Sequence, residues 1–376
     1  MSAMAVTGWG VLSAIGTGAE EFSEAWGERR SGRKDVTEMF EQKLPSETAC
    51  AIPDFDVKAH LGRKGTSFFD RSTALSVVTC KLALEDAGLV RDAKDEETDG
   101  GIGLVLGLSS GGPQAMSDFI HEMYTSEKPY LVNPLLFPYA VMNGAASATA
   151  IWHNLKGVNA TVSGGQMAFL TALRYARNKV RSGYVNAAVA GAVEEFSPTR
   201  AWASHQARGA GEERVDLGEG GAFFVLEDAQ TVRTAGRGLD AEILAVECGL
   251  YGEPGSKDDP AVGMTECIIR ALEAAGVAAS DVWAVAPSLS GSPKRDRIER
   301  VAITAALGTD TPNLLPVKEL VGETYSAAGG LQLAALLAEH RRNPERDGAV
   351  SLVTSLTSEG MVGVAVVRGW SRATSA

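Results

Sequence analysis

The amino-acid sequence predicts an α/β protein in which one structural unit is present twice. The first observation is composition: 42 glycines and only 6% aromatic residues are typical of chains with many sharp strand-to-helix turns. The second is the phrase Ala-Leu-Glu-x-Ala-Gly, which occurs at residues 83–88 and again at residues 271–276, half the chain apart. The third is that elements of the same type surround both phrases in the same order, which favours duplication over coincidence.

A helix is expected to end at each phrase. Apolar residues recur before both phrases at steps of three and four, the spacing of one helical face. Gly88 and Gly276 then follow, where a residue without a Cβ can turn left-handed and end the helix. The recurring apolar residues are Leu75, Val78 and Leu82 in the first copy, and Ile268, Ile269 and Leu272 in the second.

Strands and a second helix follow in both copies. Short apolar runs between glycines or polar residues are typical of strands buried on both faces. In the first copy we expect strands at 102–108, 159–162 and 185–192, a helix at 167–180, and a closing strand pair that ends at 222–226. The corresponding elements of the second copy are strands at 282–286, 314–317 and 349–355, a helix at 327–340 and a last strand at 362–367.

The two copies meet in a polar stretch at residues 228–238. This stretch follows the last apolar strand of the first copy and precedes the first apolar run of the second. We therefore divide the chain into an N-terminal half, residues 1–232, and a C-terminal half, residues 233–376.

Composition and charge exclude several classes of function. Of the 376 residues, 45% are hydrophobic and 22% charged, which suits a folded chain with a large core. The 35 lysines and arginines against 47 acidic residues give a formal net charge of −12, which repels nucleic acid and anionic membranes. The sequence shows neither a signal peptide nor an apolar run of the ~18 residues that a membrane span needs. We expect a cytoplasmic protein without nucleic-acid or membrane partners.

The cysteines indicate no metal site. Cys50, Cys80, Cys248 and Cys267 are scattered, and none lies within four residues of another. Paired spacing is what zinc and redox motifs require, so we expect no bound metal. Four scattered thiols suit a reducing compartment, in which they stay buried and unpaired.

Four segments carry recognisable motifs in a fixed order along nearly the whole chain. They are VTGWGVLSAIG at residues 6–16, GEGGAFFVLED at residues 218–228, a loop with Pro293, Asp296 and Glu299, and a segment with Lys318, Gly322 and residues 327–329. In this order they resemble the first strand, the glycine-rich mid-chain strand, the tail of the histidine-bearing loop and the Lys…GHxxGAAG segment of the ketosynthases of fatty-acid and polyketide synthesis. The resemblance implies the thiolase fold, a duplicated five-layer αβαβα unit that dimerises across its central sheets.

The resemblance also implies where the reacting groups would lie. Ketosynthases hold a cysteine at a strand-to-helix turn, and two histidines support malonyl decarboxylation and stabilise the oxyanion. At these positions the chain has Gln166 for the cysteine, and Ser288 and Glu323 for the histidines. A glutamine amide is no nucleophile at neutral pH, and neither serine nor glutamate replaces a neutral imidazole. We therefore expect no catalytic residue for condensation by the usual route, because the chain's five histidines all lie outside the matching segments.

A glutamine at the nucleophile position, with both histidines missing, resembles the chain length factors (ketosynthase beta subunits) of type II polyketide synthases. These non-condensing homologues pair with a Cys-His-His ketosynthase subunit and shape an interface tunnel that limits chain length. The resemblance implies no cofactor of the chain's own, because substrates travel on the phosphopantetheine of an acyl carrier protein. The residues around Gln166 differ from those of aromatic-polyketide members and the chain is short for that branch, so we favour a reduced, polyene-type product.

The resemblance places tunnel-lining side chains on the helix that follows Gly111 and Gly112. Pro113, Met116 and Ile120 are spaced by three and four residues and so share one helical face. The next segment, residues 133–143, matches a stretch that crosses the dimer interface, and its candidates are Leu135, Leu136 and Phe137. An apolar helix face also suits plain core or dimer contact, so both interpretations stay open for these residues.

Gln166 has two interpretations. It fills the vacant nucleophile pocket and hydrogen-bonds across it, or its amide stabilises a malonyl-derived enolate during decarboxylation. Loading ketosynthases that use glutamine in the second way generally keep their histidines, which favours the first interpretation here.

Two alternatives remain for the whole chain. One is a thiolase-fold malonyl-carrier decarboxylase or acyl transferase that uses Ser163 or Ser288, although no histidine is placed by sequence to activate either serine. The other is a homodimeric acyl-binding protein.

An acyl carrier protein would deliver substrate to the complex. Carrier proteins are acidic and this chain is acidic too, so we expect the carrier to dock mainly on the ketosynthase subunit. The clearest basic cluster of the chain is RNKVRSG at residues 177–183, and such runs are usually solvated helix ends.

Overall fold

The strands of the protein repeat one spatial order twice, as the duplication predicts. The computed structural model describes residues 3–90, 101–207, 215–251, 259–308 and 313–372. The main strands of the first half are β1 (Met4–Ser13), β5 (Ile102–Leu108), β6 (Asn159–Ser163), β7 (Ala187–Glu194) and β8 (Gly220–Asp228). Those of the second half are β9 (Ala241–Leu250), β10 (Val282–Ala286), β11 (Asn313–Leu314), β12 (Val350–Leu356) and β13 (Met361–Gly369).

Both halves arrange these strands in the same way. The order is β6-β5-β7-β8-β1 in the first half and β11-β10-β12-β13-β9 in the second, which is 3-2-4-5-1 in each. In each half the third, second and fourth strands are parallel, and the fifth strand is antiparallel to its two neighbours. β1 and β9 join the halves through a short antiparallel ladder, which pairs Met4 with Ile243 and Val6 with Ala241.

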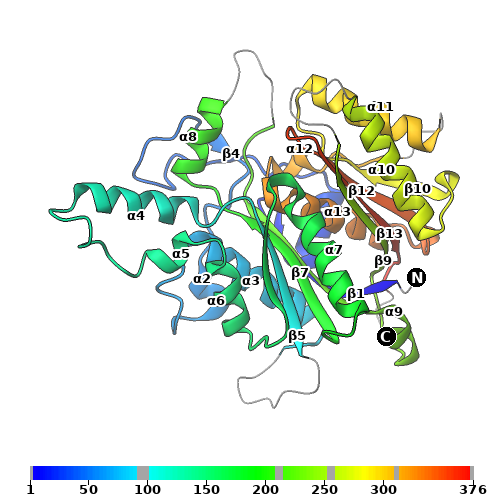
Figure 1. The fold of residues 1–376 in the computed structure, drawn as a ribbon, viewed down its shortest axis with the longest axis horizontal. Helices are drawn as coiled ribbons and strands as arrows, with labels where there is room; N and C mark the ends of the chain where they lie inside the picture. Colours follow the sequence, from blue (N-terminus) through cyan, green and yellow to red (C-terminus); the bar gives the residue numbers. More distant parts are fainter. Residues whose placement is uncertain (1–2, 91–100, 208–214, 252–258, 309–312, 373–376) are drawn as a thin grey trace.

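Helices form three layers around the two half-sheets (Figure 1). α7 (Ala168–Arg181) and α13 (Ala328–Arg342) contact strands of both half-sheets and lie between them. α3 (Arg71–Asp86) and α6 (Gly144–Trp152) cover the outer face of the first half-sheet, whereas α10 (Pro260–Ala275) and α11 (Pro293–Leu307) lie outside the second. The result is the five-layer αβαβα arrangement of the thiolase fold.

The remaining elements are short or lie at the edges of these layers. They are α1 (Gly18–Gly27), α2 (Val57–Leu61), α4 (Pro113–Thr125), α5 (Phe137–Ala140), α8 (Pro198–Ala207), α9 (Ala229–Thr234) and α12 (Lys318–Val321), with the 3₁₀ turns η1 (Gly165–Met167), η2 (Ala279–Asp281), η3 (Tyr325–Ala327) and η4 (Pro344–Arg346) and the strands β2 (Gly16–Thr17), β3 (Lys34–Asp35) and β4 (Thr48–Ala49).

Strand alternation divides the apolar side chains between separate cores. On β8, Phe223 and Val225 face the outer helices, whereas Phe224 and Leu226 face the central helix layer. β13 shows the same division, with Val364 and Val366 directed outward and Ala365 and Val367 inward. Because both faces of these strands are buried, their sequences are continuously apolar rather than alternating.

The two Ala-Leu-Glu-x-Ala-Gly phrases end equivalent helices. Gly88 and Gly276 have φ of +67° and +66°, a left-handed conformation that glycine adopts without steric cost. The helices also begin alike, since the carboxylates of Asp70 and Asp259 accept hydrogen bonds from backbone N–H groups in the first turns of α3 and α10.

The predicted strands at 102–108 and 282–286 coincide with β5 and β10, and the other predicted elements differ at their ends. The strand expected at 314–317 ends at Leu314, because the chain turns directly into α12 while Leu315 and Val317 pack in the central core. The helix expected from residue 167 begins at Ala168, after the tight η1 turn.

The proposed boundary between residues 232 and 233 falls within α9, between the last strand of one copy and the first strand of the other. Among the described helices none is long and apolar enough to cross a membrane.

Candidate functional site

Equivalent turns of the two copies meet at the centre of the molecule. η1 connects β6 to α7 in the first half, and η3 precedes α13 in the second, and the two turns pack against each other. Gln166 is the middle residue of η1 and follows Gly165, whose φ is +49°. The strand-to-helix turn therefore presents the Gln166 side chain to the second half of the chain.

Gln166 and Lys318 both contact the side chain of Glu323. Gln166 Nε2 donates a hydrogen bond of 2.8 Å to Glu323 Oε2, and Lys318 Nζ donates one of 2.7 Å to the same oxygen. The other carboxylate oxygen accepts the backbone N–H of Tyr325 at 2.8 Å. Lys318 and Glu323 are both buried, so they form a desolvated ion pair.

The backbone around Glu323 is tightly constrained. Gly322, with φ of +74°, lies so close to its neighbours that a Cβ would come within 2.7 Å of the Asp216 carbonyl oxygen and 2.9 Å of the Cys50 Cβ. Tyr325 has φ of +37°, which is unfavourable for a residue with a side chain. The Arg200 guanidinium lies 5.0 Å from the centre of the Tyr325 ring. These restraints hold the Glu323 carboxylate against Gln166.

Ser288, the third residue predicted at the position of a reacting group, does not contact Gln166 or Glu323 in the part of the chain that the structure describes. Its backbone N–H and its hydroxyl donate to the Glu299 carboxylate at 2.9 and 3.0 Å. Both Ser288 and Glu299 are buried. Desolvation raises the pKa of Glu299, although hydrogen bonds from Ser288 and Thr354 and the charge of Lys318 act against it. The structure therefore brings Gln166 and Glu323 together, whereas Ser288 is hydrogen-bonded to Glu299.

No thiol of the chain is activated as a nucleophile. Burial raises the pKa of Cys50 and of Cys267 to about 12 and that of Cys248 to about 11. The fully buried Cys80 also has a raised pKa. All four thiols are therefore protonated at neutral pH, and a thiol is a far weaker nucleophile than a thiolate.

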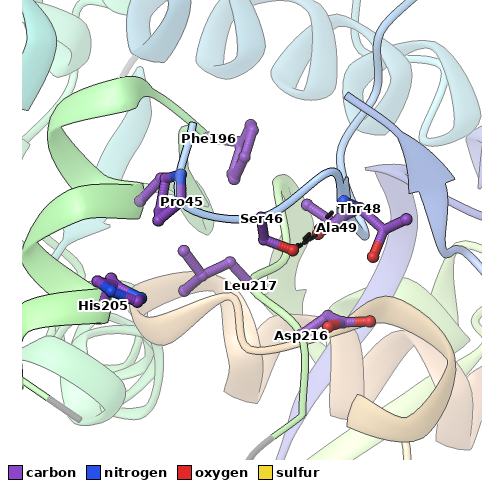
Figure 2. Close-up of a pocket in the computed structure, with 9 residues that line it drawn as sticks. Pro45, Ser46, Thr48, Ala49, Phe196, His205, Asp216 and Leu217 are labelled. Carbon is purple, nitrogen blue, oxygen red and sulfur yellow. Dashed lines mark hydrogen bonds between the residues drawn. The ribbon is translucent and has the colours of Figure 1, made fainter. Parts of the chain in front are cut away.

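The pocket around Gln166 is small and contains no histidine. It has a volume of about 50 Å³, and its lining residues are Gln166, Ser204, Val215, Leu217, Ser290, Ser292, Arg295, Glu323 and Tyr325. Figure 2 shows a second pocket of about 50 Å³, in which Pro45, Phe196 and His205 surround Leu217. His205 lines this second pocket and not the one with Gln166. Each space holds at most a few water molecules and is too small for an acyl chain.

Ser163 is exposed at the end of β6, beside the turn. Its hydroxyl contacts the carbonyl oxygen of Ser109 at 3.4 Å. A catalytic serine needs a base within hydrogen-bond distance, and the described contacts of Ser163 include none.

The side chains predicted to set chain length lie on an exposed arm. α4, α5 and the segment between them extend from one side of the first half (Figure 1). Met116 and Ile120 on α4 are 40% and 41% exposed, and Leu135 and Phe137 in the following segment are 54% and 55% exposed. Pro113 and Leu136 are half-buried. Large apolar side chains exposed this close together are typical of a surface that another protein covers.

A pair of acids below α4 was not recognised from the sequence. Glu195 accepts hydrogen bonds from the Gln114 backbone N–H at 3.1 Å and from the Ser72 hydroxyl at 2.9 Å. Burial and the nearby Asp70 carboxylate raise the pKa of Glu195 to about 7. Both acids line a cleft of about 440 Å³ that also includes Leu135 and Leu136. They are far apart in the sequence, and no motif links them.

The arrangement around Gln166 does not suit acyl condensation. A Claisen-type reaction requires a nucleophile and hydrogen-bond donors where negative charge develops. Here the Gln166 amide occupies the position of the nucleophile. The Glu323 carboxylate, whose charge opposes an oxyanion, occupies the position of a hydrogen-bond donor. Elsewhere in the described residues no three His, Cys, Asp or Glu side chains are placed to bind a metal ion together.

Comparison with known protein families finds matches to both halves of the chain. The sequence model of the beta-ketoacyl synthase N-terminal domain matches residues 1–231, and that of the beta-ketoacyl synthase C-terminal domain matches residues 241–343. Together these two domains cover most of the chain.

Individual relatives point to type II polyketide synthases. The actinorhodin polyketide putative beta-ketoacyl synthase 2 of Streptomyces coelicolor is 28% identical, over 98% of this chain and 92% of that protein. The tetracenomycin polyketide synthase ketoacyl synthase beta subunit of Streptomyces glaucescens is 27% identical, over 89% and 85%. Among solved structures, the ishigamide ketosynthase/chain length factor is 35% identical with a TM-score of 0.85, over 98% of this chain and 99% of that one.

Proposed function

The chain belongs to the beta-ketoacyl synthase family, and from its altered site we propose that it is a non-condensing chain length factor. In this role it pairs with a Cys-His-His ketosynthase subunit and shapes an interface tunnel that limits the length of a polyketide. The observation that carries the proposal is the Gln166–Glu323–Lys318 contact, which occupies the position of the reacting groups with a hydrogen-bonded ion pair. Similarity to a ketosynthase beta subunit and to a ketosynthase/chain length factor supports it.

The contact favours a structural role for Gln166. Its amide nitrogen donates to Glu323, so that group already has a partner. An enolate near the amide would also lie beside the Glu323 carboxylate, which disfavours the added negative charge. We therefore propose that Gln166 fills the vacant pocket and joins the two halves, rather than supporting decarboxylation.

The exposed arm supports the tunnel function. Met116 and Ile120 lie on one face of α4, and the ketosynthase subunit would cover this face. Each CH₂ group that a growing chain buries there gains roughly 0.8 kcal/mol while space remains. When a side chain closes the tunnel, further extension costs on the order of 1–3 kcal/mol and stops.

We propose a reduced, polyene-type chain as the substrate of the pair. The Met116 and Ile120 side chains offer no hydrogen-bond donors, which a chain rich in ketones would need when it leaves water. The growing chain would be carried on the phosphopantetheine of an acyl carrier protein, which docks mainly on the ketosynthase.

The serine-based alternative has less support. Ser288 is buried, is bonded to Glu299 and does not line the pocket around Gln166. Ser163 is exposed but has no base among its described contacts. A substrate carbonyl would reach Ser288 only after a rearrangement of the protein. It could reach Ser163, but the hydroxyl of Ser163 would not be activated.

A reconstituted pair tests the proposal. We expect Gln166→Ala to leave condensation by the pair within about twofold of the unmodified rate, because the nucleophile is on the partner. Replacement of the partner's nucleophilic cysteine by alanine is the matched control and should abolish condensation. If the pair with the disabled partner decarboxylates malonyl carrier, and Gln166→Ala removes that activity, the decarboxylase interpretation replaces ours.

A further inference from the structure

α11 presents a row of basic side chains to solvent. Lys294, Arg297 and Arg300 are exposed, and none of them forms an ion pair with a described side chain. They are spaced by three residues along the helix, so they follow one face. In a chain whose net charge is −12, a row of this kind is a local reversal of sign.

The acids on the same helix do not neutralise this row. The Asp296 carboxylate turns back to the preceding loop, where it accepts the backbone N–H groups of Ser290 and Gly291 at 2.8 and 3.1 Å. Glu299 is buried and hydrogen-bonded to Ser288. Basic and acidic residues are interspersed in the sequence of α11. Asp296 and Glu299 bond to the preceding loop, so the exposed face carries the basic residues.

The basic row lies at an unfavourable end of the helix. Lys294 and Arg297 are in the first two turns of α11, where unpaired backbone N–H groups already make the end positive. Cations at this end destabilise an isolated helix, and local rules of this kind are typically broken at functional surfaces. An acidic group placed here would interact with both the side chains and the helix end.

The face also has an apolar part. Val301 is 49% exposed, one turn beyond Arg297, and Ala305 follows it. A shallow hollow of about 620 Å³ runs along α11, and within the described residues its lining comes from this helix alone. Apolar contact beside a row of cations suits a protein partner better than a free ion.

The position of α11 fits a partner other than the ketosynthase. α11 lies on the opposite side of the molecule from the α4 arm, so a subunit that covers α4 leaves α11 free (Figure 1). Arg295 of the same helix lines the pocket that contains Gln166. A protein bound to α11 would therefore lie beside the degenerate site.

The basic cluster at residues 177–183 is engaged within the protein. Arg177 is buried and donates to the carbonyl oxygen of Leu244 at 3.0 Å. Lys179 lies 5.0 and 4.4 Å from the ring centres of Tyr175 and Tyr184. These contacts engage Arg177 and Lys179 within the protein, and α11 is the better docking surface.

We propose that the basic face of α11 is a second docking surface for the acidic acyl carrier protein, in addition to the main one on the ketosynthase. This inference rests on the proposed function, which supplies the carrier as a partner. Carboxylates of a carrier helix would pair with Arg297 and Arg300, and its apolar side chains would contact Val301.

Carrier binding to the complete pair tests this surface. The carrier is titrated into the pair containing Arg297→Glu with Arg300→Glu, and the matched control reverses the same charge at Lys179 and Arg181. We expect the α11 variant to bind about tenfold more weakly, with a reduced salt dependence, and the control to bind as the unmodified pair does. A photo-crosslinking residue at Val301 should capture the carrier.

The outcomes separate this inference from the proposed function. Unchanged affinity of the α11 variant, without a crosslink at position 301, overturns the docking surface while the pair itself remains intact. A labelled oligonucleotide that binds α11 as tightly as the carrier overturns the assignment to a carrier. If no pair forms, the proposed function fails, and the same titration with the chain alone still decides whether α11 binds the carrier.

Discussion

The ion pair between Lys318 and Glu323 is informative because buried charges are costly. Removing an ion pair from water costs several kcal/mol per ion, and only close contact with further hydrogen bonds compensates for it. Glu323 meets this requirement with three donors, from Gln166, Lys318 and the Tyr325 backbone. A site kept for chemistry would leave such groups available to a substrate, whereas here they are all bonded to one another.

Single residues also showed what the sequence alone could and could not predict. Gln166, Ser288 and Glu323 were found by their position within motifs, without knowledge of their contacts. The motif also contained Lys318, but its ion pair depends on the fold of the loop after α12. Glu195 and Asp70 were missed because long-range packing, not a shared motif, brings two carboxylates together and buries them.

Glu195 makes stability depend on pH. Its pKa is about 7 in the folded protein, above the usual 4.5 of a glutamate, so the folded state holds this proton more tightly than the unfolded state. As the pH rises from about 5 to 7, this residue therefore reduces stability, and above pH 7 the full penalty is present. The other charged groups near it are Asp70, Glu194 and Arg71.

Glu195→Gln should remove this dependence while keeping an acceptor for the Gln114 N–H group. We expect the variant to be more stable than the unmodified protein, and we expect this difference in the free energy of unfolding to increase by on the order of 2–3 kcal/mol from pH 5 to pH 8. Melting temperatures of both proteins across that range measure the difference. Glu38→Gln, at an exposed position, controls for the loss of a charge. A difference that is the same at every pH would contradict the account of Glu195.

At the scale of elements, α4 separates two environments. The Gln114 backbone bonds to the buried Glu195, whereas Met116 and Ile120 are exposed on another side of the helix. The acid below α4 therefore anchors the helix that presents the proposed tunnel residues. The resemblance to ketosynthases predicted this helix and the residue spacing predicted the shared face of Met116 and Ile120, but neither predicted the contact with Glu195 beneath it.

Shortening a side chain on this face should lengthen the product. Met116→Ala or Ile120→Ala removes the group that closes the tunnel, so the pair is expected to release chains longer by about one extender unit. Mass spectrometry of products from the reconstituted pair measures the change. Met361→Ala, a methionine of the second half, is the control. An unchanged product distribution in both α4 variants would move the chain-length role elsewhere.

α11 shows why charge is harder to predict than periodicity. Its sequence, PKRDRIERVAITAAL, contains acids and bases in similar places, and no pattern identifies which ones are internal. The structure separates them, because Asp296 and Glu299 bond to the loop before the helix. The cluster at residues 177–183 was more prominent in the sequence, yet Arg177 is buried.

At the scale of the whole molecule, duplication explains most of the fold. The repeated strand order, the paired glycine helix ends and the two central helices all follow from one unit present twice. Local patterns were enough to predict the duplication and the order of elements along the chain, whereas the five-layer packing was implied only by the resemblance to ketosynthases. They could not show that the half-sheets are joined through β1 and β9, which depends on how the halves pack.

Duplication also explains why Gln166 and Glu323, from different halves of the chain, meet and bond to each other. The turns η1 and η3 are equivalent elements that meet at the centre, so one residue from each half reaches the same point. In this chain that meeting point is a hydrogen-bonded ion pair, and the exposed apolar surface lies on the α4 arm instead. We propose that this apolar surface binds a second subunit, which would bury an interface of roughly 2,000 Å² or more if the pair is obligate.

The mass and subunit composition of this chain, co-expressed with the ketosynthase of its own pathway, test the central claim most directly. We expect a stable complex with one copy of each chain, and poor solubility of this chain when it is expressed alone. A well-behaved homodimer that does not associate with the ketosynthase would contradict the account.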